Sequence, residues 1–468
     1  MANKNASAPS QNTFLERWFS ISASNSTARI EVVAGLTTFM TMSYIIFVNP
    51  LILGTVRDSA GNTLPKDALM TATCLTAGVM SILMGVFTNY PFALAAGMGL
   101  NAVVAHELVG LHGLTWPGAM GIIFMEGCII TILVVAGVRE AVMDAIPLSL
   151  KRAVGAGIGL FIAFIGFRQA GIVSITEEGL ALGEMRGIPI AVALLGLLLT
   201  AWLVARGIRA GLLLGIIIST AVALAANAAS GGKAGFAPGT AVMPSQFFAV
   251  PKLDTVGLFD FSAFAVMGVL PAVLVTFCIM LSDFFDTIGT VVAVGEQAGF
   301  LQPDGSLPRT KRVLLIDSLA AVAGGITGSS SATTYIESAS GVAAGGRTGL
   351  TAVVVGLCFL AAVVLNPLAG VVPTQAVAPA LIVVGFLMMM SAKDIPFERI
   401  DEGLPAFLTM LLMPFTNSIT NGIAAGFLLY TAVQILLGRW RQVRAPMYIV
   451  CIGFLVYFIR PALEHWIR

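Results

Sequence analysis

Two segments that carry carboxylates interrupt sequence that is otherwise apolar and rich in glycine and serine. LSDFFDTIGT (281–290) holds Asp283 and Asp286, and TTYIESASG (333–341) holds Glu337. Only 10% of the chain is charged, against about a quarter of an ordinary soluble domain. An ionisable side chain at membrane depth is costly and by default marks a substrate or proton site. Both segments are therefore candidates for such a site.

Asp283 and Asp286 are three residues apart, so they share one face of a helix. Two anions in a low dielectric repel, and one of them must face water, pair with a cation or bind a proton. Thr290, one turn after Asp286, adds a hydroxyl to the same face. The alternative is a charge cluster at the inner mouth of the protein with Glu296, Arg309 and Arg312, and it applies more to Asp283.

The composition identifies the class of protein. Of 468 residues, 57% are hydrophobic and the mean hydropathy is +0.94, which predicts a polytopic membrane protein because a soluble fold could not bury so much apolar surface. A net charge of +1 gives no field that would attract nucleic acid. The five cysteines are isolated, which argues against a disulfide framework and a metal site. The chain carries no Walker loop, HExxH or GxSxG motif. We expect an ion gradient as the energy source, with no cofactor and no enzymatic activity.

Long uncharged stretches predict the helices, since about 20 apolar residues span a bilayer. Lysine and arginine concentrate in alternate loops, which predicts a cytoplasmic amino terminus. A last apolar stretch, 445–459, is short and is expected at the interface. The predicted helices are 31–53, 68–88, 97–109, 118–138, 148–167, 188–205, 210–228, 262–290, 310–326, 336–346, 349–366, 374–391, 403–416 and 419–437.

The two halves of the chain, separated by a long polar loop, share a pattern. Residues 85–101 and 325–341 each contain a helix end, an extended segment and a short helix that cannot cross the bilayer alone. Pro147 and Gly159 have the same spacing as Pro373 and Gly385. Seven elements per half would give the halves opposite topology. Inverted repeats with broken helices are typical of secondary transporters, and the breaks indicate a site near the midplane.

The two extended segments, 89–96 and 328–335, need covering, because bare backbone is not tolerated at membrane depth. We expect them to pair as two short strands. The half-helices would then start close together, with free N–H groups that favour acceptors or negative charge. Glu337 would lie in the first turn of its half-helix and face the site. The alternative is that it only caps that helix.

Four further ionisable residues lie near the predicted helices. Asp317 and Glu126 lie within apolar helices, where each could tie two helices together or touch substrate. His106 and Glu107 end a short helix, and His112 follows them. A solvated outer face is the expectation for these last three.

Four segments resemble one transporter family. EVVAGLTTFMTMSYIIFVNP (31–50), AAGMGLNA (95–102), FFDTIGT (284–290) and TTYIESASGVAAGGRTGLTA (333–352) are similar to the AzgA-like branch of the nucleobase:cation symporter-2 superfamily. Its members are bacterial and fungal permeases for adenine, guanine and hypoxanthine. The resemblance implies an all-α fold of about fourteen transmembrane segments in a seven-plus-seven inverted repeat, like the uracil transporter, with short strands before the half-helices of segments 3 and 10.

The resemblance also implies a division into two domains, with the base bound between them. The sequence adds a disordered cytoplasmic tail, an outer loop and a carboxyl-terminal apolar segment. The expected parts are the tail 1–28, a core domain of 29–140 and 262–368, a gate domain of 141–230 and 369–440, the outer loop 231–261 and the terminal segment 441–468.

Site residues follow from the same motifs. The resemblance implies that Asp286 and Glu337 serve base binding and proton coupling, together with Gly99 and Asn101 in base binding. Asp283 departs from the hydrophobic pattern expected at its position. Asn101 offers a donor and an acceptor, and a carboxylate can accept two N–H donors from a base edge. The remaining candidates are the hydroxyls of Thr334, Ser338 and Thr290 and the aromatic rings of Phe92 and Tyr44, which could stack on the base.

The resulting hypothesis is a proton-coupled importer of purine nucleobases, favouring guanine and hypoxanthine over adenine. It would be a multi-pass protein of the inner (plasma) membrane, in contact with the lipid bilayer and possible as a homodimer. Sodium is the alternative coupling ion. The alternatives for function are an anion carrier of the sulfate or bicarbonate type with the same fold, and a pyrimidine or xanthine permease.

Overall fold

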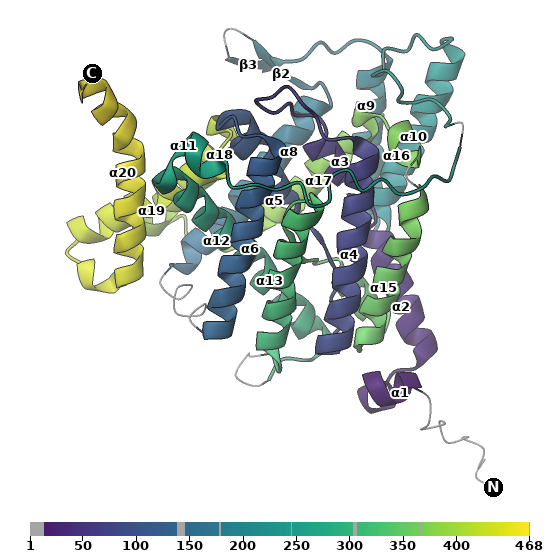
Figure 1. The fold of residues 1–468 in the computed structure, drawn as a ribbon, viewed down its shortest axis with the longest axis horizontal. Helices are drawn as coiled ribbons and strands as arrows, with labels where there is room; N and C mark the ends of the chain where they lie inside the picture. The colour runs from purple at the N-terminus through teal and green to yellow at the C-terminus, as the bar shows by residue number, and fades with distance from the viewer. Residues whose placement is uncertain are drawn as a thin grey trace.

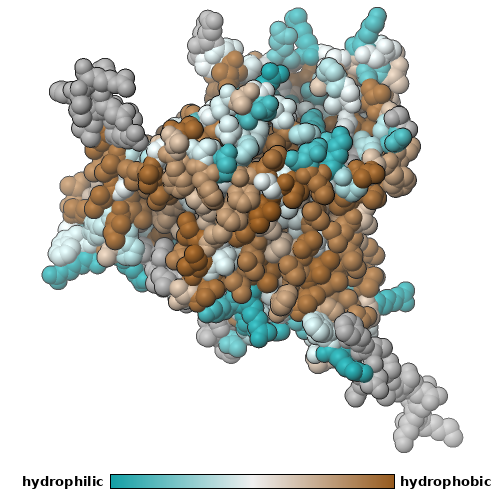
Figure 2. Space-filling view, in the orientation of Figure 1, coloured by the Kyte–Doolittle hydropathy of each residue, from teal (hydrophilic) through white to brown (hydrophobic). Residues whose placement is uncertain are grey.

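The fold is mainly helical, and the computed structural model describes residues 14–137, 146–176, 179–244, 246–302, 307–365 and 367–467. Within these ranges nine helices are long and apolar enough to cross a membrane. Shorter apolar helices cover Met98–Leu111, Gly349–Leu365 and Ala445–Ile459. On the face shown in Figure 2, a broad apolar band lies between two hydrophilic ends. This is the surface of a multi-pass membrane protein. The predicted tail residues 1–13 and the predicted inner-loop residue Arg139 lie outside the described ranges.

The first half of the chain runs from the short α1 to α10 (Figure 1). Its elements are α1 (Phe14–Phe19), α2 (Ala28–Met42), α3 (Ile45–Leu53), α4 (Lys66–Thr88), β1 (Leu94–Ala96), α5 (Met98–Ala102), the π-helical stretch η2 (Val103–Leu111), α6 (Trp116–Ala136), α8 (Leu148–Gln169), β2 (Val173–Thr176), β3 (Gly179–Leu182), α9 (Ile188–Ala205) and α10 (Gly211–Ala229).

The second half follows the polar loop after α10. Its elements are α11 (Ala263–Met267), α12 (Val269–Ala298), α13 (Thr310–Thr327), β4 (Ala332–Thr334), α14 (Ser338–Ala343), α15 (Gly349–Ala362), α16 (Pro367–Val371), α17 (Thr374–Met389), α18 (Ile400–Thr416), α19 (Ile419–Leu436) and α20 (Ala445–Ile467).

Strands from the two halves meet inside the protein. β1 and β4 pair antiparallel, with Leu94 opposite Thr334 and Ala96 opposite Ala332, so the predicted pairing is confirmed. The Gly97 amide donates to the Ser331 carbonyl at 2.9 Å, which extends the pairing. The buried backbone is thereby satisfied without water. Because the strands are antiparallel, α5 and α14 leave the pair in opposite directions.

Glycines allow the closest helix crossing at the site. α8 and α17 pack along one another, and a Cβ added to Gly159 would lie only 2.6 Å from the Gly385 carbonyl oxygen. No side chain fits at that separation. The two glycines that the sequence pattern matched between the halves are therefore in direct contact.

The predicted helix 262–290 differs from the structure. Gly268 has φ 82°, which separates the short α11 from α12. α12 then continues to Ala298 and ends at Gly299, whose left-handed φ of 71° caps the helix. The apolar sequence after Thr290 supports these extra turns.

The amino-terminal region also differs from the prediction of a disordered tail over 1–28. Residues 14–19 form α1, and Phe19 and Ile21 are buried against Leu350 of α15. The Asn89 side-chain amide donates to the Phe19 carbonyl at 2.9 Å. Apolar residues at the end of the tail thus dock onto the helix bundle.

Two peripheral features complete the fold. A hairpin of β2 and β3, which the sequence did not predict, pairs Val173 with Leu182 and projects at the end of the molecule opposite α1 (Figure 1). α20, where an interfacial segment was expected, packs beside α12 and α19 at the edge of the bundle.

Candidate substrate site

A cavity of about 460 Å³ lies where the strand pair meets α12 and α17. We call it the site cavity. Both carboxylates that the sequence singled out, Asp286 and Glu337, line it. Gly99, Thr290 and Thr334 of the predicted set line it too. Its other lining residues are Gly97, Met98, Phe285, Gly289, Tyr335, Ile336, Val384, Leu387 and Met388.

Glu337 immediately precedes α14 and is half-buried. Its side chain makes no capping bond to α14, so it does not act as that helix's own cap. The Tyr44 hydroxyl, which is buried between α2 and α3, donates to Glu337 Oε1 at 2.6 Å. Tyr44 therefore orients the carboxylate that lines the site cavity.

Asp286 lies on α12 and is exposed. The next residue, Thr287, is buried and donates from Oγ1 to Asp317 Oδ2 at 2.6 Å. Its hydroxyl also shares a hydrogen bond of 2.7 Å with that of Thr333. These contacts fix the rotation of α12, so that Asp286 and Thr290 line the site cavity.

Asp317 of α13 anchors the strand that leads to Glu337. Its Oδ1 accepts from the Thr334 amide at 3.0 Å and from the Thr334 hydroxyl at 2.9 Å. Asp317 is fully buried and does not line the site cavity. Of the two roles considered for it, the structure has the tie between elements. Glu126 of α6 makes a similar contact, because its Oε2 accepts from the Ser331 hydroxyl at 3.3 Å.

The aromatic rings at the site cavity are not the two expected from the sequence. Phe285 and Tyr335 line it, and the Tyr335 hydroxyl donates to the Ala96 carbonyl at 2.6 Å. Phe92 instead packs on Tyr90, with ring centroids 5.3 Å apart, on the other face of the strand pair. The sequence analysis missed Phe285, although it directly precedes Asp286.

Three other predicted site residues lie outside the lining of the site cavity. Ser338 accepts at its hydroxyl from the Ala93 amide at 3.0 Å. Asn101 is fully buried, and neither atom of its amide group has a hydrogen-bond partner among the described residues. Asp283 is fully buried, one turn before Asp286 on α12.

A second cavity, of about 350 Å³, adjoins the site cavity and shares Gly99, Asp286 and Met388 with its lining. It extends to Lys151 and Arg152 at the start of α8, and we call it the basic-end cavity. A third, of about 1010 Å³, is lined by α8, η2 and the β2–β3 hairpin. This hairpin-end cavity shares no lining residue with the other two.

The sequence and the fold can now be compared with known proteins. Residues 29–425 match the model of the Permease family. The chain belongs to this family. The permease is thus a transporter and not an enzyme, and the resemblance to nucleobase:cation symporter-2 proteins is confirmed.

Full-length relatives carry purine names. The permease is 40% identical to the adenine permease AdeP of Escherichia coli, over 98% of this chain and 99% of that protein. It is 39% identical to the guanine/hypoxanthine permease PbuG of Bacillus subtilis, over 95% and 99%. The putative permease MJ0326 of Methanocaldococcus jannaschii is 38% identical over 95% and 98%.

Solved structures of low identity share the fold. The transmembrane domain of the cyanobacterial bicarbonate transporter BicA has a TM-score of 0.61 at 13% identity, covering 85% of this chain and 97% of that one. Murine Slc26a9, an anion transporter in the inward-facing state, has a TM-score of 0.60 at 12% identity, covering 94% and 74%. At such identities the likeness concerns the fold alone.

Proposed function

We propose that this permease imports purine nucleobases together with protons. The observation that carries the proposal is the pair of carboxylates, Asp286 and Glu337, on two sides of one cavity of base-sized dimensions. Relatives at 38–40% identity named for adenine and for guanine/hypoxanthine support the purine class.

The proposed base contact is Glu337. Guanine presents two adjacent N–H donors on one edge, and an ionised carboxylate accepts both. Adenine presents a donor beside a ring-nitrogen acceptor on the matching edge, so an ionised Glu337 would leave that acceptor facing a second acceptor. This chemistry supports guanine and hypoxanthine as the favoured bases. Phe285 or Tyr335 would supply the stacking surface.

The proposed proton site is Asp286. Two anions that line one cavity repel each other, and a proton on Asp286 removes that repulsion. In the proposed cycle the proton arrives first from outside, the base binds to Glu337, and both leave on the other side. The proton gradient, in place of a cofactor, would supply the energy.

We also propose the arrangement of domains. Fourteen segments would form an inverted repeat, with a core of 29–140 and 262–368 moving against a gate of 141–230 and 369–440. The β1–β4 pair and the Gly159–Gly385 contact support an internal two-fold relation. Lys151 and Arg152 support a cytoplasmic location of the basic end and the amino terminus.

The rival function is anion transport, which shares the fold. An anion would enter a cavity lined by two acids, Asp286 and Glu337. That arrangement repels an anion unless both acids are neutral, and so it disfavours the rival. A pyrimidine or xanthine permease would share the same acids and has to be separated from a purine permease by competition.

The test is uptake of labelled guanine into cells that lack their own purine permeases. Unlabelled hypoxanthine, adenine, uracil, xanthine and sulfate serve as competitors, with and without a protonophore. We expect competition by purines and loss of accumulation with the protonophore. Accumulation that ignores the protonophore would overturn proton coupling. Competition by sulfate alone would support the rival.

A further inference from the structure

The site is closed at one end, and α8 passes through the closure. Gly155 and Ile158 of α8 line the basic-end cavity, and Ile165 and Arg168 line the hairpin-end cavity. Between them Phe161 is fully buried. α8 therefore contacts both cavities and an apolar barrier that separates them.

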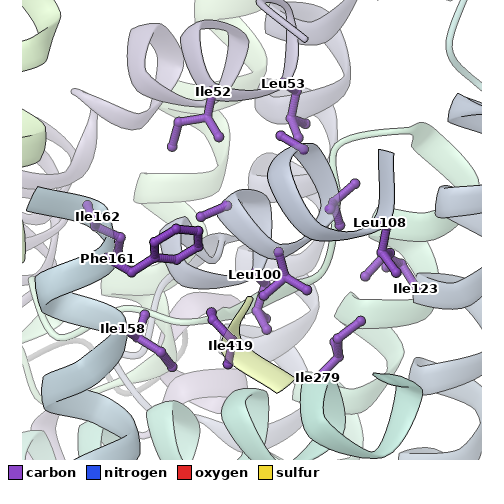
Figure 3. Packing of buried hydrophobic residues seen from close by; sticks show 14 of the residues in the cluster. Ile52, Leu53, Leu100, Leu108, Ile123, Ile158, Phe161, Ile162, Ile279 and Ile419 are labelled. Atoms are coloured by element: carbon purple, nitrogen blue, oxygen red, sulfur yellow. The ribbon is translucent and has the colours of Figure 1, made fainter. Parts of the chain in front are cut away.

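The helix that leaves the strand pair repeats this order. Gly99 lines the site cavity, Val103 and Val104 are buried, and Ala105 and His106 line the hairpin-end cavity. Figure 3 shows Leu100 on this helix close to Ile158 and Phe161 of α8. In this conformation the site cavity opens at the basic end and is shut at the hairpin end.

A buried carboxylate bridges two elements at the shut end. Glu107 of η2 was expected to be solvated, but it is fully buried. Its Oε1 accepts from the Ser418 hydroxyl at 2.8 Å, and its Oε2 accepts from the Ile419 amide at 2.8 Å and the Thr420 amide at 3.4 Å. Glu107 thus caps the amino end of α19, where free amides and the helix dipole favour a negative charge.

Other groups around Glu107 leave its charge to α19. The titratable side chains that interact with it electrostatically are the Cys278 thiol of α12 and the Tyr457 hydroxyl of α20. The part of the chain that the structure describes places no Lys or Arg in an ion pair with it. Its bonds to α19 are charge-assisted, and such bonds are stronger than neutral ones.

We propose that Glu107 is a latch that holds the hairpin end closed and must release α19 before the site can open there. The inference rests on the proposed domains, in which η2 belongs to the core and α19 to the gate. It makes Glu107 a positioning residue of the transport cycle, acting through the closure and not through the base.

Thiol labelling tests the latch without substrate. Ala105→Cys reports the hairpin end, because Ala105 lines that cavity but is fully buried in this conformation. Ser391→Cys reports the basic end. Both are made in a background where the partly exposed Cys128 and Cys358 are replaced by serine. Open membrane fragments give a hydrophilic thiol reagent access to both ends.

Glu107→Gln removes the charge and turns N–H donors towards the α19 amides. We expect labelling at Ala105→Cys to rise relative to Ser391→Cys by about tenfold, as the loss of one charge-assisted bond would produce. Ser418→Ala keeps the carboxylate and the two amide contacts, and should give a smaller shift in the same direction. It also keeps the test decisive if Glu107→Gln does not fold.

The matched control is Glu31→Gln. Glu31 is another fully buried carboxylate that accepts from backbone amides, those of Arg347 and Thr348 at the start of α15, but α2 and α15 both belong to the proposed core. It should lower stability without changing the labelling ratio. An unchanged ratio in Glu107→Gln and Ser418→Ala, or an equal change in Glu31→Gln, would overturn the latch. Because no base is present, failure of purine uptake would leave this result intact.

Discussion

Tyr44 and Glu337 are 293 residues apart in the chain and share a hydrogen bond of 2.6 Å at the site cavity. One comes from the junction of α2 and α3, and the other from the start of α14. The bond uses one lone pair of Oε1 and leaves the remaining acceptor positions of the carboxylate for a ligand. Tyr44 thus contributes to the site through the orientation of Glu337.

Tyr44→Phe removes this bond while keeping the ring. Hydrogen bonds to charged groups contribute about 1.5–3 kcal/mol, so we expect the KM for guanine to rise by about tenfold or more, with little change in maximal rate. Uptake kinetics at constant expression measure it. Tyr90→Phe is the control, since its hydroxyl donates to the Pro308 carbonyl away from the site cavity. Equal KM values for the two variants would contradict the role of Tyr44.

The two carboxylates should fail differently when neutralised. Glu337→Gln should abolish guanine binding, because the amide group offers only one acceptor atom. Asp286→Asn should still exchange labelled for unlabelled guanine but should no longer accumulate it, because it carries no transported proton. Wild-type uptake should fall as external pH rises, and the profile of Asp286→Asn should be flat. A normal pH profile in Asp286→Asn would assign the proton elsewhere.

Asp317→Ala should destabilise the whole protein. It leaves the buried hydroxyls of Thr287 and Thr334 and the Thr334 amide without their acceptor, and each unsatisfied group costs about 1–3 kcal/mol. We expect a Tm in detergent that is lower by several degrees and a loss of guanine-induced stabilisation. Thr287→Val removes one donor only and should have a smaller effect. Asp317→Ala with an unchanged Tm would contradict the anchoring role.

The α8–α17 crossing should reject any side chain. Gly159→Ala places a Cβ 2.6 Å from the Gly385 carbonyl oxygen, so the helices must separate. We expect loss of monodisperse protein in size-exclusion chromatography and loss of uptake. Gly155→Ala is the control on the same helix, where the nearest listed atom to the new Cβ would be Ser391 Oγ at 3.7 Å. Similar behaviour of the two variants would show that the crossing tolerates a wider spacing.

Hydropathy predicted much of the fold, because lipid requires apolar runs and self-contained hydrogen bonding. Helix 188–205 matches α9, and the strand pair was predicted from the need to cover bare backbone. The β2–β3 hairpin and the docking of α1 were not predicted, since they depend on contacts made outside the membrane-spanning elements. The break at Gly268 was missed because a single glycine does not interrupt an apolar run.

For the site, sequence alone identified Asp286 and Glu337 because charge is rare in this chain. It did not separate lining from support. Phe92 shares a strand face with Tyr90 and Leu94, and the two-residue alternation could have placed it with them on the far side. The burial of Glu107 could not be foreseen, because α19, which covers it, is 311 residues away from it at Ser418.

The pairing of Leu94 with Thr334 also constrains how the protein is made. When the first half has been inserted, the strand that precedes α5 has no partner, because β4 has not yet been synthesised. Its amides and carbonyls must stay with water or the insertion machinery until most of the chain has emerged. Assembly of the transport site is therefore a late step of biogenesis, and truncation before residue 334 should leave a first half that is recognised and degraded as incomplete.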